Sequence, residues 1–480
     1  MAAESDGKDA DKAKGPLERV LSVFADVRRG ESITALLLAL GIFFLLAAYY
    51  VLKPVRDSLI TGVPDGAKYK SYMGAAIAVA LLGAVPAYGR FASRVPRNKL
   101  LFGVGTFFVL NLIGFFALSL LPQTREGTGL LVFALGFFLW VGIFNMMIIA
   151  QFWALANDIY SEDQGKRLFP LVAIGQSVGS AVGSTVVTTY AKKIGTEPMF
   201  IVGAVLLAVS TALTLLVSRR EQDAVAAHKA KAADAADKDA EEPKKAEEGD
   251  DGPFQLVLKH RYLLLIAAFA TVFTLVNTNA EYVKDELIPA LAKERGEAQG
   301  LDADGIKSLR TALFGEFYNW VNILGVVLQS FVVSRAVKYL GLKRAFFILP
   351  VVAFVDAAAI ALVPLWSIVK WTKIAENSVD YSLNNTLRNM LWLPTTRRMK
   401  YLAKQAVDTF FVRLGDVTSA LCVLVFAQLL NLGVRTFGFI NAGLVLLWLV
   451  IAAAIIRENA KLTAAKSEKD PGADKGGKEA

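Results

Sequence analysis

The sequence contains twelve apolar stretches of membrane-spanning length, in two groups of six that an acid-rich segment separates. Since an α-helix rises about 1.5 Å per residue, about 20 residues cross the roughly 30 Å hydrocarbon core of a bilayer. The expected spans are residues 32–53, 71–92, 99–121, 129–156, 167–190, 198–218, 260–284, 311–334, 344–362, 365–392, 405–430 and 436–456. We therefore expect an all-α polytopic membrane protein, with about twelve transmembrane helices in two pseudo-symmetric six-helix halves.

Polar segments flank and divide these spans. The expected parts are a polar tail at 1–31, an N-terminal half at 32–218, a charged linker at 219–259, a C-terminal half at 260–456 and a second polar tail at 457–480. The loops at 90–99 and 335–344 are rich in lysine and arginine and contain no acidic residue. Because such loops stay in the cytoplasm, we expect both tails and the linker to be cytoplasmic, with a bacterial inner membrane as the location.

The composition argues against several other classes of protein. Hydrophobic residues make up 55% of the chain, and its net charge of +9 comes from basic residues in short loops, where they set membrane orientation. We therefore expect no nucleic-acid partner and no obligate protein partner. Cys422 is the only cysteine, and His228 and His260 are the only histidines, so we expect no metal site and no cofactor.

A short internal repeat supports duplication of the two halves. The segment VRDSLI at 55–60 follows the first expected span, and VKDELI at 283–288 follows the seventh. The two basic loops also occupy matching places in each half. This pattern is typical of transporters built from two related repeats.

The segment Gly175-Gln176-Ser177-Val178-Gly179 fits the G-x-S-x-G pattern of serine hydrolases. That pattern needs a strand-to-helix turn and a histidine base, whereas this segment lies in an expected membrane helix and the only histidines, His228 and His260, lie in or beside the polar centre of the chain. Together with Gly183, the two glycines instead form a small-xxx-small ridge that lets two helices approach closely. We therefore expect helix packing here, and a protein that is not an enzyme.

Ionisable and amide residues recur within or at the ends of the expected spans, where a charge is costly unless it faces a partner or a water-filled cavity. They are Lys53, Arg56, Asp57, Asn157, Asp158, Glu281, Lys284, Asp285, Arg388, Arg413 and Asp416. The group at 53–57 closes the first expected helix, and the group at 281–285 closes the seventh. An alternative interpretation is that these residues are snorkelling anchors or gate ion pairs.

Basic residues from the first, seventh, tenth and eleventh helices together indicate a cavity for an anion. The expected substrate-binding residues are Lys53, Arg56, Asn157, Lys284, Arg388 and Arg413. The expected gate or charge-pair residues are Asp57, Asp158, Glu281, Asp285 and Asp416.

Several longer segments resemble a known family. YYVLKPVRDSL at 49–59, FWALANDIYSEDQGKRLFPLVAIGQSVG at 152–179, YSLNNTLRNMLWLP at 381–394 and AKQAVDTFFVRLG at 403–415 resemble the ATP/ADP nucleotide transporter (ADP,ATP carrier) family of plastids and intracellular bacteria. The resemblance implies a major-facilitator-like fold and antiport of ATP and ADP, with nucleotide binding. Arg56 stands where that family carries a functionally important lysine.

The sequence departs from the family's pattern at three places. The family's acidic residue of the fourth helix falls near Val141 or Asn145, and its glutamate of the seventh falls near Asn277, unless Glu281 takes that role. Asp416 stands in place of a lysine of the eleventh helix. The resemblance implies nucleotide exchange by alternating access. A carrier of another organic anion and a non-transporting membrane sensor or scaffold are the alternatives.

Overall fold

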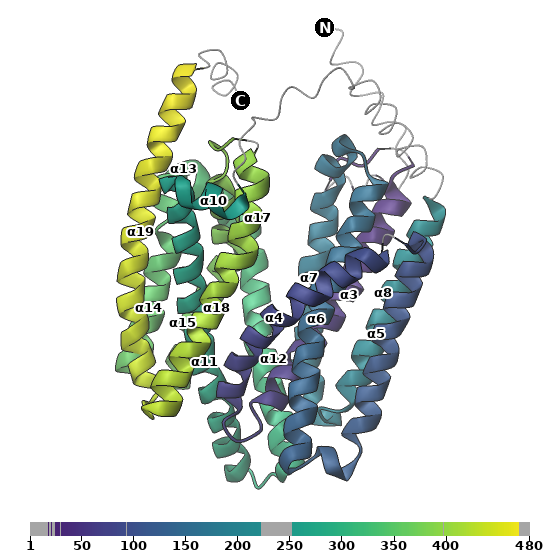
Figure 1. Cartoon of the computed structure of the whole chain (residues 1–480). Helices are drawn as coiled ribbons and strands as arrows, with labels where there is room; N and C mark the ends of the chain where they lie inside the picture. Colours follow the sequence, from purple (N-terminus) through teal and green to yellow (C-terminus); the bar gives the residue numbers. More distant parts are fainter. Residues whose placement is uncertain are drawn as a thin grey trace. The chain divides into compact units, whose positions relative to one another are not determined.

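A computed structural model describes residues 30–92, 94–221, 252–396 and 398–469, together with six residues between 18 and 28 (Figure 1). Most of the expected linker and the outer parts of both expected tails lie outside the described residues. Within the described residues the chain is helical and contains no strand, and each of the twelve expected spans falls on helix. The all-α polytopic fold class is therefore confirmed.

Six long helices precede the linker. They are α3 (Ser32–Ile60), α4 (Gly66–Ala92), α5 (Arg97–Ser119), α6 (Gly127–Ile159), α7 (Glu162–Ile194) and α8 (Pro198–Arg220), with a short 3₁₀ turn, η1, at Pro122–Thr124.

After the linker, five π-helical turns interrupt the described run of α-helices. The α-helices are α10 (Pro253–Lys259), α11 (Arg261–Ala298), α12 (Ala303–Val327), α13 (Val333–Ala345), α14 (Ile348–Leu362), α15 (Trp366–Val379), α16 (Asn385–Met390), α17 (Lys404–Ala406), α18 (Val412–Cys422) and α19 (Val434–Lys469). The π-helical turns are η2 (Leu328–Val332), η3 (Asp380–Asn384), η4 (Met399–Ala403), η5 (Val407–Phe411) and η6 (Val423–Leu429).

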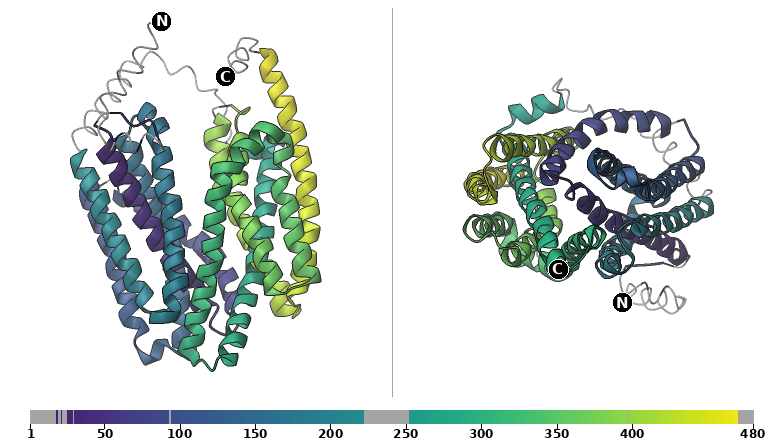
Figure 2. Two further views of the ribbon diagram at one scale, coloured as in Figure 1. Left: turned by 180° about the vertical axis from the view of Figure 1, so that it is seen from behind. Right: turned by 90° about the horizontal axis from the view of Figure 1, so that it is seen from below.

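The chain divides into two compact units, and within each unit the long helices run alongside one another (Figure 2). The first unit contains α3 up to Leu59, α4 from Val79, α5 to α8, and the segment 299–319 with the start of α12. The second contains residues 60–78, α10, α11 up to Ala298, and the chain from Trp320 onward. Helices α4 and α12 therefore each contribute residues to both units.

Nine helical segments among the described residues are long and apolar enough to cross a membrane. Three further expected spans are helical but fall outside that set: α4, the 15-residue α14, and the segment formed by α15, η3 and α16. The chain is thus a multi-pass integral membrane protein.

Several expected helix ends are wrong. Helix α3 continues through Pro54 to Ile60, α11 continues through Pro289 to Ala298, and α19 continues to Lys469, into the expected polar tail. The charged groups at 53–57 and 281–285 therefore lie inside long helices and do not close them. Hydropathy marks only where the apolar run stops. The backbone hydrogen bonds of a helix form within the helix whatever the polarity of its side chains, so a helix can continue beyond that point.

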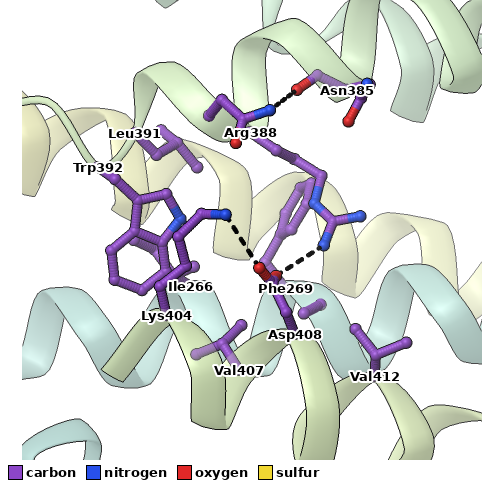
Figure 3. A pocket seen from close by; sticks show the side chains of 12 residues that line it. Ile266, Phe269, Asn385, Arg388, Leu391, Trp392, Lys404, Val407, Asp408 and Val412 are labelled. Carbon is purple, nitrogen blue, oxygen red and sulfur yellow. Dashed lines mark hydrogen bonds and ion pairs between the residues drawn. The ribbon is translucent and has the colours of Figure 1, made fainter. Parts of the chain in front are cut away.

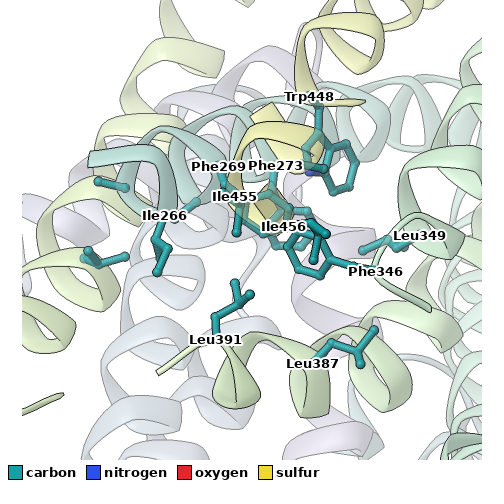
Figure 4. Packing of buried hydrophobic residues seen from close by; sticks show 14 of the residues in the cluster. Ile266, Phe269, Phe273, Phe346, Leu349, Leu387, Leu391, Trp448, Ile455 and Ile456 are labelled. Carbon is teal, nitrogen blue, oxygen red and sulfur yellow. The ribbon is translucent and has the colours of Figure 1, made fainter. Parts of the chain in front are cut away.

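The second unit has an aromatic core between α11, α14 and α19 (Figure 4). The Phe269 ring stacks on Phe346 with centroids 5.0 Å apart and meets the Trp448 ring edge-on at 5.6 Å. Such pairs each contribute about 0.5–1.5 kcal/mol beyond the burial of their area. This core fixes α11, which carries the charged residues of the candidate site.

The glycine ridge of α7 packs against α3 in the first unit. A Cβ atom added at Gly175, Gly179 or Gly183 would collide with a backbone carbonyl oxygen of α3, at Ala39, Phe43 and Ala47 respectively. The expectation of close helix packing at this motif is confirmed, because only glycine permits this approach.

Candidate functional site

In the first unit, α3 places three of the predicted charged residues near Tyr318 of α12. The Arg56 guanidinium donates to the Asp57 carboxylate, with Nε 2.9 Å from Oδ1, and lies 4.4 Å from the centroid of the Phe138 ring. The Tyr318 hydroxyl donates to Asp57 Oδ2 at 2.5 Å. Lys53 Nζ lies 4.0 Å from the Tyr318 ring centroid. The structure therefore brings Lys53, Arg56 and Asp57 together. The carboxylate of Asp57 is fully buried.

In the second unit, Lys284 of α11 is fully buried between two carboxylates. Its Nζ lies 2.6 Å from Glu281 Oε2 and 3.2 Å from Asp285 Oδ1. Asp285 also accepts a hydrogen bond from Lys70 Nζ, at 2.8 Å. Residues 281, 284 and 285 are three or four positions apart or adjacent on α11, so Glu281 shares a helix face with Lys284 and Asp285. This group of three therefore forms within a single helix.

Helix α15 adds a second buried lysine to the same group. Lys373 Nζ lies 2.5 Å from Glu376 Oε2, 2.8 Å from Asn277 Oδ1 and 3.8 Å from Glu281 Oε1. The Asn377 amide donates to Glu281 at 3.0 Å. Glu281 therefore joins α11 to α15, and the eight residues form what we call the buried lysine network: Lys70, Asn277, Glu281, Lys284, Asp285, Lys373, Glu376 and Asn377.

The ion pairs of this network join equal numbers of lysines and carboxylates, and the buried Asp356 of α14 adds a further carboxylate beside Lys373. Three ammonium groups, on Lys70, Lys284 and Lys373, meet three carboxylates, on Glu281, Asp285 and Glu376. Lys284 and Lys373 are fully buried, and the Lys70 side chain is 11% exposed. Taking such groups out of water is costly unless each is paired. The arrangement can exchange one oxyanion for another at a lysine, because a phosphate offers the same acceptor oxygens as a carboxylate.

The remaining predicted arginines of the second unit have their own acidic partners. Arg413 donates to Asp416 at 2.9 Å, and Asp416 also accepts a hydrogen bond from Thr278. Arg388 lies 3.5 Å from Asp408.

Arg388 lines a cavity of about 310 Å³ together with Asn385, Trp392 and Lys404. Lys404 and Arg388 approach Asp408 from two sides, with Lys404 Nζ 3.1 Å from the carboxylate (Figure 3). The cavity therefore presents two cations to a single carboxylate.

The predicted pair at the end of α6 is separate from these groups. Asn157 is exposed, and Asp158 forms an ion pair with Arg97 at the start of α5. This contact joins two neighbouring helices of the first unit.

Sequence reasoning missed several partners. Lys70 precedes the expected start of the second span, and Tyr318 carries no charge that would have drawn attention to it. Lys373 and Glu376 did give a signal, because both stand in the tenth expected span and are too polar to face lipid.

The sequence and the fold are both similar to those of known membrane transporters. A sequence model of the Major Facilitator Superfamily matches residues 142–375. The structure is similar to the nucleoside transporter NupG, with 15% identity and a TM-score of 0.56 over 88% of this chain and 98% of that chain. The fold is major-facilitator-like.

Two further solved transporters have the same fold. A bacterial homologue of the iron transporter ferroportin, in an inward-facing state, is 13% identical, with a TM-score of 0.59 over 88% of this chain and 98% of that one. The peptide transporter POT, solved with sulfate, is 12% identical, with a TM-score of 0.58 over 92% of this chain and 99% of that one. Comparison with curated proteins gave no match. These similarities concern the fold alone.

Proposed function

We propose that the chain is a secondary transporter that exchanges nucleotides of the ATP/ADP type across a membrane by alternating access. The observation that carries the proposal is the buried lysine network, which holds three ammonium groups within an integral membrane fold. Ionisable groups at membrane depth mark substrate pathways more often than they serve structure. The sequence resemblance to nucleotide transporters supplies the substrate class.

The pairing of Lys284 gives the proposed transporter a way to couple substrate binding to a conformational change. Glu281 and Asp285 neutralise Lys284. A phosphate that binds Lys284 displaces these carboxylates and breaks the network. Substrate therefore has a different affinity for the intact and the opened arrangement, which is the requirement for driving a conformational change.

A specific observation favours a second candidate, a carrier of a less highly charged organic anion. The three predicted arginines each lie beside a carboxylate: Arg56 by Asp57, Arg388 by Asp408 and Arg413 by Asp416. These pairs leave less positive charge for a triphosphate. Competition of dicarboxylates and nucleoside monophosphates against ADP binding separates the two candidates.

Binding of ADP to the purified protein tests the proposed site. Arg56→Ala and Lys284→Ala should each weaken binding by about 1.5–3 kcal/mol, the range for a charge-assisted hydrogen bond. Arg56→Lys should be milder because the positive charge stays. Isothermal titration of each folded variant measures the change.

The matched control is Lys293→Ala, on the same helix as Lys284 but 72% exposed, whose ion-pair partner among the described residues is Glu297. It should bind ADP like the wild type. Wild-type affinity in both alanine variants would mean that Arg56 and Lys284 are structural anchors, and the proposed nucleotide site would be wrong.

A further inference from the structure

An apolar pocket of about 470 Å³ lies between α4, α5 and α6 in the first unit. Its walls include Phe91, Leu100, Phe107, Phe108, Trp140 and Met147. Phe91 and Phe107 are 54% and 55% exposed, so the pocket opens to the surroundings of the helices. In a membrane-spanning unit an apolar opening of this kind suits a hydrocarbon chain.

One cation stands at the end of this pocket. Lys99, in the first turn of α5, is the only charged residue of its lining, is exposed, and has no ion pair or hydrogen bond among the described residues. Its neighbour Arg97, by contrast, is paired with Asp158. Lys99 is thus available to an anion from outside the protein.

The dimensions of the pocket match one leaflet of a bilayer. Nine residues separate Lys99 from Phe108 along α5, which corresponds to about 13 Å of helix. Half of the hydrocarbon core measures about 15 Å. An acyl chain whose headgroup lies at Lys99 would therefore extend to the level of Phe108 and its ring neighbour Trp140, whose centroid lies 5.4 Å away.

We propose that this pocket binds an acyl chain of an anionic phospholipid, with the lipid phosphate on Lys99. The chain fills the apolar space between the aromatic rings, and the unpaired ammonium group selects a negatively charged headgroup over a zwitterionic one. Trp140 lines the pocket, so the fluorescence of its ring reports on whatever occupies the pocket. The proposal is independent of the transported substrate.

Quenching of tryptophan fluorescence by brominated acyl chains tests this directly. The full chain is reconstituted in phosphatidylcholine vesicles with either brominated phosphatidylglycerol or brominated phosphatidylcholine as the minor lipid. The difference between wild type and Trp140→Phe isolates the Trp140 signal. We expect phosphatidylglycerol to quench that signal at least twofold more strongly than phosphatidylcholine.

Two variants separate the chain from the headgroup. Gly103→Leu places a side chain in the pocket, where a Cβ atom would meet nothing within 4 Å, and should remove the Trp140 quenching by both lipids. Lys99→Gln should remove the preference for phosphatidylglycerol and keep the quenching. Gly114→Leu, on the same helix, outside the pocket and equally free of clashes, is the control and should change neither.

The contradicting results are equally specific. Equal quenching of Trp140 by the two lipids in the wild type would exclude headgroup selection, and unchanged quenching in Gly103→Leu would exclude the pocket as the chain site. Should Gly103→Leu fail to fold, the Lys99→Gln comparison still decides whether the anionic headgroup is recognised.

Discussion

Lys373 and Glu376 lie one turn apart on α15 and form an ion pair that is 0% and 2% exposed. Lys373→Met leaves the Glu376 carboxylate buried without its closest cation. Breaking a buried pair on one side costs about 3–5 kcal/mol, so we expect a large fall in the thermal unfolding temperature. Differential scanning fluorimetry in detergent measures it.

The double variant Lys373→Met/Glu376→Gln is the control for this prediction. Neutralising Glu376 as well removes the carboxylate that the single variant leaves without its closest cation, so the double variant should be more stable than the single one. A single variant as stable as the wild type would show that the network is hydrated and not held in a low-dielectric interior.

At the scale of residues, the sequence predicted which positions carry charge but not which partners they meet. Arg56 and Asp57 are adjacent in the chain, so their pairing could be anticipated. Lys70 meets Asp285 across more than two hundred residues. No local pattern reports such a contact, because it depends on how the helices pack.

At the scale of elements, a polar clamp ties the residue before α3 to the first two turns of α7. Arg167 donates to both oxygens of Glu31, at 3.0 and 2.9 Å, and the Gln164 side chain donates to it at 3.2 Å. Gln164 also closes the capping box of α7 with Ser161. The segment 161–167 therefore fixes both the start of α7 and its contact with α3.

This clamp makes stability depend on pH. Burial raises the pKa of the Glu31 carboxyl, but hydrogen bonds from Arg167, the Arg28 N–H and Gln164 outweigh burial and hold the pKa below its ordinary value of 4.5. A carboxylate with a lowered pKa in the folded state stabilises the fold above its unfolded pKa. That stability is lost as the pH falls through the folded pKa.

Glu31→Gln should therefore unfold at a lower temperature than the wild type at pH 7. The gap should narrow as the pH falls below 4.5 and through the lower pKa that the Glu31 carboxyl has in the folded state. Thermal melts from pH 7 to 3 measure this, with the exposed Glu126→Gln as the control. A gap that stays constant over the whole range would show that the charge of Glu31 contributes nothing.

Hydropathy predicted the position of the helices better than their ends or their regularity. The apolar runs correspond to α3 and α11, but both helices continue through a proline into charged segments. The π-helical turns η3, η5 and η6 could not be anticipated either, because one extra residue in a turn leaves no mark in a hydropathy pattern.

At the scale of the whole molecule, the basic loops lead us to propose that both termini and the linker lie in the cytoplasm. Reporter fusions at Ala232 and Ala480 check this. We expect a cytoplasmic reporter to be active at both positions. Activity of only a periplasmic reporter at these positions would reverse the proposed orientation and exclude the assignment of the loops at 90–99 and 335–344 to the cytoplasm.

The most direct test of nucleotide exchange is flux across a membrane that contains only this protein. Proteoliposomes loaded with ADP should take up labelled ATP, empty ones should take up far less, and Lys284→Ala should lose most of the exchange while Lys293→Ala retains it. ATP uptake that is no greater with internal ADP than without it would contradict the account, and nucleotide binding without any flux would identify a sensor in place of a transporter.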